Sequence, residues 1–127
     1  ELGWDLRHED FAPPFFVAPG SDVNRHHGTA VWGQVAAKRD EKGMTGIAHQ
    51  VRFGVSVAQW TGDQTSFWSA HVPRAIDLAA SRLSSGDVLI LELQAPGPDE
   101  GRFMPIEYYR AIYDVIRAAT NRGIIVV

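Results

Sequence analysis

Two adjacent histidines followed by a glycine and a threonine are the residues of this chain best suited to acid–base chemistry. They are His26, His27, Gly28 and Thr29, at the start of a stretch with a helical pattern. An imidazole accepts and returns protons near neutral pH, which is what a general base must do. A histidine on such an irregular backbone can equally be a loop residue without a role, so these four residues alone leave both interpretations open.

Histidine and acidic side chains also gather near the amino end and could be considered as metal ligands. A metal site needs several such ligands at short spacing. His8, Glu9 and Asp10 lie together, but with His26 and His27 they form no His-x-x-x-His or similar pattern. We therefore expect no metal and no cofactor. Asp10 is expected to cap or tie down its loop, with a contribution to a calcium site as the alternative.

Several other residues have a structural interpretation and a functional one. The aromatic side chains of residues 59–71 either line a substrate groove or form a small core of their own. Of the two adjacent histidines, we expect His27 to be the base and His26 to be its neighbour rather than a second base. The remaining histidines are expected to be surface or structural residues. The residues concerned are Trp60, Phe67 and Trp68 for the aromatics and His8, His49 and His71 for the histidines.

Hydrophobic periodicity predicts the elements that must position these residues. Helices and strands alternate along the chain, and this order is typical of a parallel sheet with helices on its faces. Functional sites in such sheets gather at the carboxyl ends of the strands. The pattern predicts helices over residues 28–38, 72–83 and 105–122, strands over 51–58, 87–93 and 124–127, and long loops at 59–71 and 94–104.

Three details of these elements are specific enough to check. Thr29 is expected to cap the first helix, and the strand at 87–93 is expected to be buried because its apolar run is almost continuous. Gly123 is expected to end the last helix. The apolar stripe of that helix is predicted at Ile106, Tyr109, Tyr113 and Ile116, with Glu107, Arg110, Asp114 and Arg117 facing water.

Composition excludes several classes of function. The chain has 127 residues, a formal net charge of −3, 45% hydrophobic residues and no cysteine. Without cysteine there is no disulfide scaffold, cysteine nucleophile or zinc ribbon. A mildly acidic chain is a poor nucleic-acid binder, and no apolar run approaches the ~20 residues of a membrane helix. We therefore expect neither nucleic acid nor membrane as a partner.

The residues around His27 resemble the active-site histidine motif of the subtilisin-like serine proteases. The motif reads His-Gly-Thr-Ala-Val-Trp-Gly over residues 27–33, followed by Gly-Ile-Ala at 46–48 before a predicted strand. Residues 4–11 are similar to the His-Pro-Asp-Leu-type segment that follows the family's catalytic aspartate. Residues 75–79 and then 87–90 are similar to the helix and strand that lead to its substrate-binding edge, and residues 118–127 to the helix and strand before its oxyanion-hole asparagine.

The resemblance implies a fold and a set of roles. The fold would be three-layer α/β, a parallel sheet with helices on both faces, of which residues 1–127 are an incomplete, internal part. His27 would be the general base of an Asp-His-Ser triad, and an extended peptide or protein substrate would pair with the edge formed by Leu91, Glu92, Leu93 and Gln94. The resemblance favours a secreted or extracellular location, and the oligomeric state stays open.

The chain also departs from the family pattern. The family's aspartate is expected before Glu1 and its asparagine after Val127, and the Gly-Thr-Ser nucleophile motif is found nowhere. We therefore expect His27 to lack a well-placed acidic partner, unless Asp5 or another chain supplies one. Gln94 stands where the family often has glycine, which would place a side chain on the path of a substrate backbone.

These observations predict a serine endopeptidase of the subtilisin-like family, with only the histidine of its triad in this chain. The alternative is a catalytically inactive subtilisin-like domain that acts as a binding or scaffold module, motivated by Glu92 and Gln94. A third interpretation, a nucleotide-binding α/β domain, lacks support because no glycine-rich phosphate loop follows a predicted strand.

Overall fold

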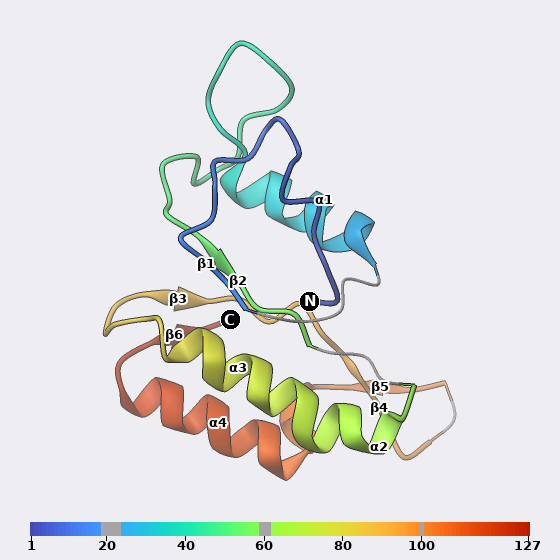
Figure 1. The fold of residues 1–127 in the computed structure, drawn as a ribbon. Helices are drawn as coiled ribbons and strands as arrows, with labels where there is room; N and C mark the ends of the chain where they lie inside the picture. Colours follow the sequence, from blue (N-terminus) through green and yellow to red (C-terminus); the bar gives the residue numbers. More distant parts are fainter. Residues whose placement is uncertain (19–23, 59–61, 100) are drawn as a thin grey trace.

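The structure is a computed structural model that describes residues 1–18, 24–58, 62–99 and 101–127. Short strands alternate with helices along most of the chain (Figure 1). The elements, in order, are β1 (Phe16–Val17), α1 (Arg25–Ala36), β2 (Gly54–Val55), α2 (Gln64–Ser66), the π-helix η1 (Phe67–His71), α3 (Val72–Ala80), β3 (Val88–Leu89), β4 (Ala95–Pro96), β5 (Phe103–Met104), the 3-10 helix η2 (Ile106–Tyr108), α4 (Arg110–Asn121) and β6 (Ile125–Val126).

The described strands form three separate two-stranded sheets. β1 pairs with β2 in parallel, with Phe16 opposite Gly54. β3 pairs with β6 in parallel, with Val88 opposite Ile125, and β4 pairs with β5 in antiparallel fashion. The helix–strand alternation therefore does produce parallel pairing, whereas one continuous three-layer sheet stays a prediction.

The larger hydrophobic core lies where α3, α4 and η1 meet. Val72 and Ile112 are fully buried at its centre, and Phe67 and Trp68 are buried beside them. Trp68 also stacks on Tyr109, with ring centroids 5.5 Å apart. Of the two interpretations of these aromatics, the structure therefore supports the core rather than a substrate groove. Trp60 lies outside the described residues.

The loop predicted over residues 59–71 is wrong for its second half, which is helical. Asp63 caps α2, because its carboxylate accepts hydrogen bonds from the backbone N–H groups of Thr65 and Ser66 at 3.0 and 3.2 Å. These bonds, together with one from the Ser66 hydroxyl, lower the pKa of Asp63. Residues 59–71 show no helical spacing of apolar side chains, because the π-helical turns at Phe67–His71 break the 3.6-residue repeat.

The first helix begins at Arg25, three residues before the predicted start. Thr29 does not cap it, so that prediction is wrong. The Thr29 hydroxyl lies one turn inside the helix and donates a 2.6 Å hydrogen bond to the carbonyl oxygen of Arg25. Asn24 stands at the capping position without a side-chain hydrogen bond.

The predicted exposed face and the predicted end of the last helix are confirmed. Its buried residues differ from the predicted ones. Gly123 has φ of +81°, a left-handed conformation that ends the helix as predicted. The residues predicted to face water are exposed. The buried positions within α4 are Ile112 and Ala119, whereas Tyr113 is 42% exposed. The stripe is shifted because η2 precedes α4, so the helical phase restarts at Arg110.

The predicted strands 51–58 and 87–93 are each reduced to two paired residues. Phe53 and Val55 are buried as the alternation predicts, but Val51 is exposed. The prediction that residues 87–93 form a buried strand is wrong at Val88, which is 52% exposed although Leu89 is buried. Among the described residues, β3 pairs with β6 on one edge and with no strand on the other, and this leaves Val88 uncovered.

A second, smaller core holds α1 against the amino-terminal segment. Phe53 packs edge-on against both Phe11 and Trp32, with ring centroids 6.1 and 5.2 Å apart. Ala36 and Val55 complete it. None of the helices in the described part of the chain has the length and apolar character needed to cross a bilayer.

Candidate functional site

The His-Gly-Thr motif lies at the amino end of α1 and contacts the extended amino-terminal segment. Thr29 binds it directly: the backbone N–H of Asp5 donates a 2.7 Å hydrogen bond to the Thr29 hydroxyl oxygen. Gly28 is buried against the carbonyl oxygen of Gly3, and a Cβ at Gly28 would collide with that oxygen. The threonine therefore clamps residues 1–5 to the helix, and the glycine lets the two backbones approach.

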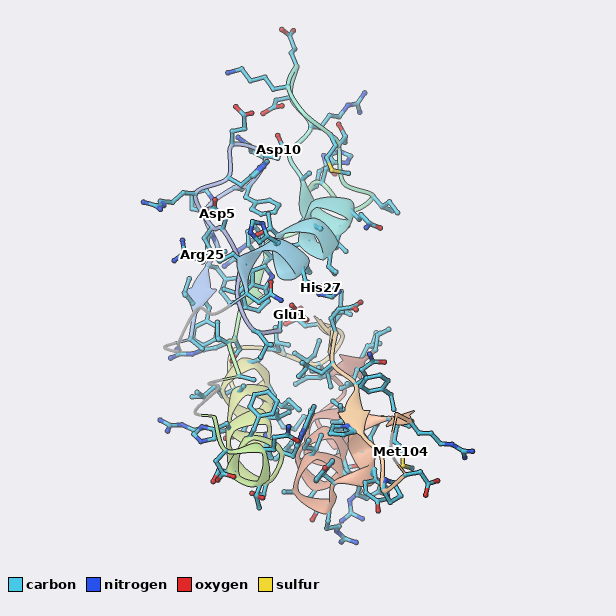
Figure 2. All side chains as sticks on the ribbon, turned by 90° about the vertical axis from the view of Figure 1, so that its right-hand side faces the viewer. Glu1, Asp5, Asp10, Arg25, His27 and Met104 are labelled. Atoms are coloured by element: carbon cyan, nitrogen blue, oxygen red, sulfur yellow. The ribbon has the colours of Figure 1, made fainter. Side chains whose placement is uncertain are left out.

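This close approach brings Glu1 to His27. The Glu1 carboxylate oxygen Oε2 lies 3.2 Å from Nδ1 of His27, and the Glu1 side chain is only 9% exposed. Figure 2 shows the two residues together, at the junction between the part of the molecule that holds α1 and the part that holds α3 and α4. The expectation that His27 lacks a well-placed acidic partner is therefore wrong, because Glu1 supplies the carboxylate.

The imidazole itself remains open to solvent. His27 is 58% exposed, at the amino end of a helix, as the sequence predicts. With Nδ1 facing Glu1, the other ring nitrogen, Nε2, has no hydrogen-bond partner among the described residues. A carboxylate at Nδ1 favours the tautomer that carries its proton on Nδ1, and this leaves Nε2 as a proton acceptor. The arrangement can therefore act as a carboxylate-supported general base.

Glu1 also connects His27 to the ends of two strands. Its carbonyl oxygen accepts a 3.1 Å hydrogen bond from Ala58 N–H, three residues beyond β2. Glu1 also lines the same cavity as Glu92 and Leu93, which follow β3. Glu1 therefore lies near the residues that follow β2 and β3, and functional sites in parallel sheets gather at such carboxyl ends of strands.

The predicted substrate edge is an extended segment with alternating exposure. Leu91 and Leu93 are partly buried against the larger core, whereas Glu92 and Gln94 are exposed. The backbone N–H of Leu91 donates to the carbonyl oxygen of Val127 at 2.9 Å, so the residue after β6 pairs with the start of this segment. The Gln94 side chain thus points outward instead of filling the core.

The residue that sequence reasoning missed is Glu1. A signal for it was present, since Glu1 is the acidic residue directly ahead of the segment 4–11, where the resemblance places a catalytic acid. The aspartate was expected before Glu1, and this left Glu1 itself without a role. Nothing in the sequence alone shows that Gly3 packs on Gly28, and this contact brings the acid to the histidine.

The two other acids considered near the amino end do not reach His27 in this structure. Asp5 Oδ1 accepts a 3.1 Å hydrogen bond from the backbone of Arg7, within its own turn. Asp10 is buried and lies well away from His27 (Figure 2). Its Oδ2 accepts a long 3.4 Å bond from Met44 N–H, and its carbonyl oxygen accepts a 2.7 Å bond from Lys38 N–H. Asp10 therefore ties its loop to residues 38–44, as one of its two interpretations predicts.

Replacing Gly28 by alanine should separate the pair. The new methyl group collides with the Gly3 carbonyl and meets Trp4 Nε1 at 3.0 Å, so residues 1–4 must move off the helix. We expect G28A to lose about 1–3 kcal/mol of unfolding free energy, as overpacked sites do. G33A is the matched control in α1, because a Cβ there meets only Met44 Sδ at 3.5 Å. Urea unfolding of both variants measures this, and equal stabilities would contradict the proposed contact.

The described residues contain no group of three or more histidine, aspartate or glutamate side chains placed to hold a metal ion. Comparison with known protein-family models, with curated proteins and with solved structures finds no significant match to this chain.

Proposed function

We propose that this chain carries the acid and the base of a subtilisin-like serine endopeptidase, with Glu1 and His27 in those roles. One observation carries the proposal: a poorly exposed carboxylate lies 3.2 Å from Nδ1 of a solvent-exposed histidine at the amino end of a helix. The His-Gly-Thr motif supports it further, because each of its three residues contacts the segment that holds the acid.

In the proposed mechanism His27 Nε2 removes the proton from a serine hydroxyl as its oxygen attacks a peptide carbonyl. The imidazolium formed is stabilised by Glu1, whose burial limits solvent screening of the attraction. The C–N bond of the tetrahedral intermediate then breaks, and Nε2 returns the proton to the leaving amine. Water repeats the sequence on the acyl-enzyme, so the serine is regenerated.

The substrate would bind in extended form along residues 91–94. Main-chain hydrogen bonds to such an added strand give affinity, and side-chain contacts give selectivity. Glu92 and Gln94 are exposed on this segment, so they are the side chains that would contact the substrate or the solvent around it. The serine and the oxyanion-binding asparagine have to come from outside residues 1–127.

A serine-directed fluorophosphonate probe tests the proposal. Residues 1–127 alone should give no stoichiometric serine labelling, because no Gly-Thr-Ser motif is present. The protein encoded by the gene in which this chain occurs should be labelled at one serine beyond Val127 and should hydrolyse a casein substrate. Stoichiometric labelling of a serine within residues 1–127, or no labelling of either protein, would overturn the proposal.

The second candidate is an inactive subtilisin-like module that binds a partner along the same segment. Two observations favour it: the acid at His27 is glutamate where the resemblance implies aspartate, and the Gln94 side chain projects where a glycine is often found. The same experiment separates the candidates, since an inactive module is labelled in neither form.

A further inference from the structure

A cavity lies between the β1–β2 sheet and the β3–β6 sheet. A strand edge borders it on each side, so one further strand could fit between the two sheets. It has a volume of about 320 Å³ and is lined by β2 on one side and β3 on the other. Side chains of α1, such as Trp32, and of α3, such as Ile76, line it as well. Figure 1 shows these two helices on opposite sides of the strands, so the cavity lies in the strand layer.

Both strands direct into this cavity backbone groups for which the described part of the chain provides no backbone hydrogen-bond partner. The carbonyl oxygens of Phe53 and Val55 accept bonds of 2.8 and 2.9 Å from residues of the β1 segment. Because the backbone groups of alternate residues point to opposite edges of a strand, those of Gly54 and Ser56 point away from β1. Both of these residues line the cavity.

β3 repeats the pattern from the other side. The carbonyl oxygens of Asp87 and Leu89 accept bonds of 2.8 and 3.0 Å from Ile125 and Val127 of the β6 segment. The backbone groups of Val88 and Ile90 therefore point away from β6, and both residues line the cavity. An open edge on each side of an apolar space is unfavourable, since edge groups need partners.

Glu1 already makes the first hydrogen bond of the missing ladder. Ala58 continues the series of Gly54 and Ser56, and its N–H donates to the Glu1 carbonyl oxygen at 3.1 Å. A backbone that leads into Glu1 alongside β2 would run parallel to it and meet Ser56 and Gly54 next.

We propose that an extended apolar strand joined to the amino side of Glu1 occupies this cavity, parallel to β2 and β3. About five residues at ~3.3 Å each would span the edge from Gly54 to Ala58. The strand would unite the two sheets in the order β1, β2, new strand, β3, β6. It would also cover Val88, which is 52% exposed, and hold Glu1 beside His27.

The total exposed area agrees with an uncovered interior. The accessible surface is 8009 Å² for a 14.0 kDa chain, against about 6,700 Å² expected for a compact domain of that mass. The strand edges, the cavity lining and the exposed area do not involve the chemistry of His27, so a failure of this proposal and a failure of the peptidase proposal are distinguishable.

Amide hydrogen exchange on the full chain with a Val-Val-Ile-Val-Val extension before Glu1 tests the proposal. The control extension, Val-Pro-Ile-Pro-Val, is similarly apolar, but its prolines remove two N–H donors. We expect the first extension to slow exchange at Gly54, Ser56, Val88 and Ile90 by about tenfold or more relative to the control. Equal exchange in the two proteins, or protection confined to other strand edges, would overturn the proposal.

A pair of α-helix variants makes the test specific to the cavity. Ala79→Phe on α3 fills the cavity from its lining, so it should abolish the added protection. Ala118→Phe is the matched control on the exposed surface of α4 and should leave the protection intact. Protection that survives Ala79→Phe unchanged would show that the extension binds elsewhere.

Discussion

Replacing His27 with alanine should lower kcat for peptide hydrolysis by about 10³- to 10⁶-fold in the protein that contains the serine nucleophile. The physical reason is that Nε2 of His27 is the proton acceptor in the proposed mechanism, and Glu1 faces the other ring nitrogen. Without the imidazole, the serine must attack as a neutral hydroxyl, and only substrate positioning and the oxyanion site remain. Steady-state kinetics on a chromogenic peptide measures the loss.

His26 provides the matched control for this change. It is the neighbouring histidine, is also exposed in the first turn of α1, and has no ion-pair contact with Glu1. We expect His26→Ala to change kcat by less than about tenfold, within the range of a residue outside the chemistry. Equal losses in the two variants would show that His27 is the wrong base.

Replacing Glu1 with glutamine should lower kcat by about 10⁴-fold with little change in KM. The amide keeps the size of the side chain but can donate a hydrogen bond to Nδ1, which favours the tautomer with its proton on Nε2. That tautomer cannot accept the serine proton. The amide also carries no charge to stabilise the imidazolium. Kinetics at saturating substrate separates this loss in kcat from any loss of binding.

Two further variants show whether the carboxylate itself matters. Glu1→Asp keeps the charge on a shorter side chain, so its kcat should fall between those of the wild type and Glu1→Gln. Asp5→Asn alters the other acid of the clamped segment, whose carboxylate faces Arg7, and should leave kcat nearly unchanged. If Glu1→Gln also keeps kcat within about tenfold, His27 acts without Glu1 and the proposed pair is wrong.

The sequence by itself predicted α1, α3 and α4 approximately, although it missed the helical turns at residues 64–71 and shifted the buried stripe of the last helix. Val72 and Ile76 of the predicted helix 72–83 are buried one turn apart, and Gly123 ends the last helix in a left-handed conformation. It also predicted an exposed histidine at the amino end of a helix. These features depend on local periodicity and backbone preference, which neighbouring residues in the chain determine.

Strand burial and the partner of His27 were decided by tertiary structure. Val88 belongs to a run that is apolar enough for a buried strand, yet it is exposed because no strand pairs with that edge of β3 among the described residues. Glu1 meets His27 only because Gly28 lets the Gly3 backbone pack against α1. Both outcomes depend on contacts between residues at least twenty-five positions apart, and local patterns of charge and hydrophobicity do not encode such contacts.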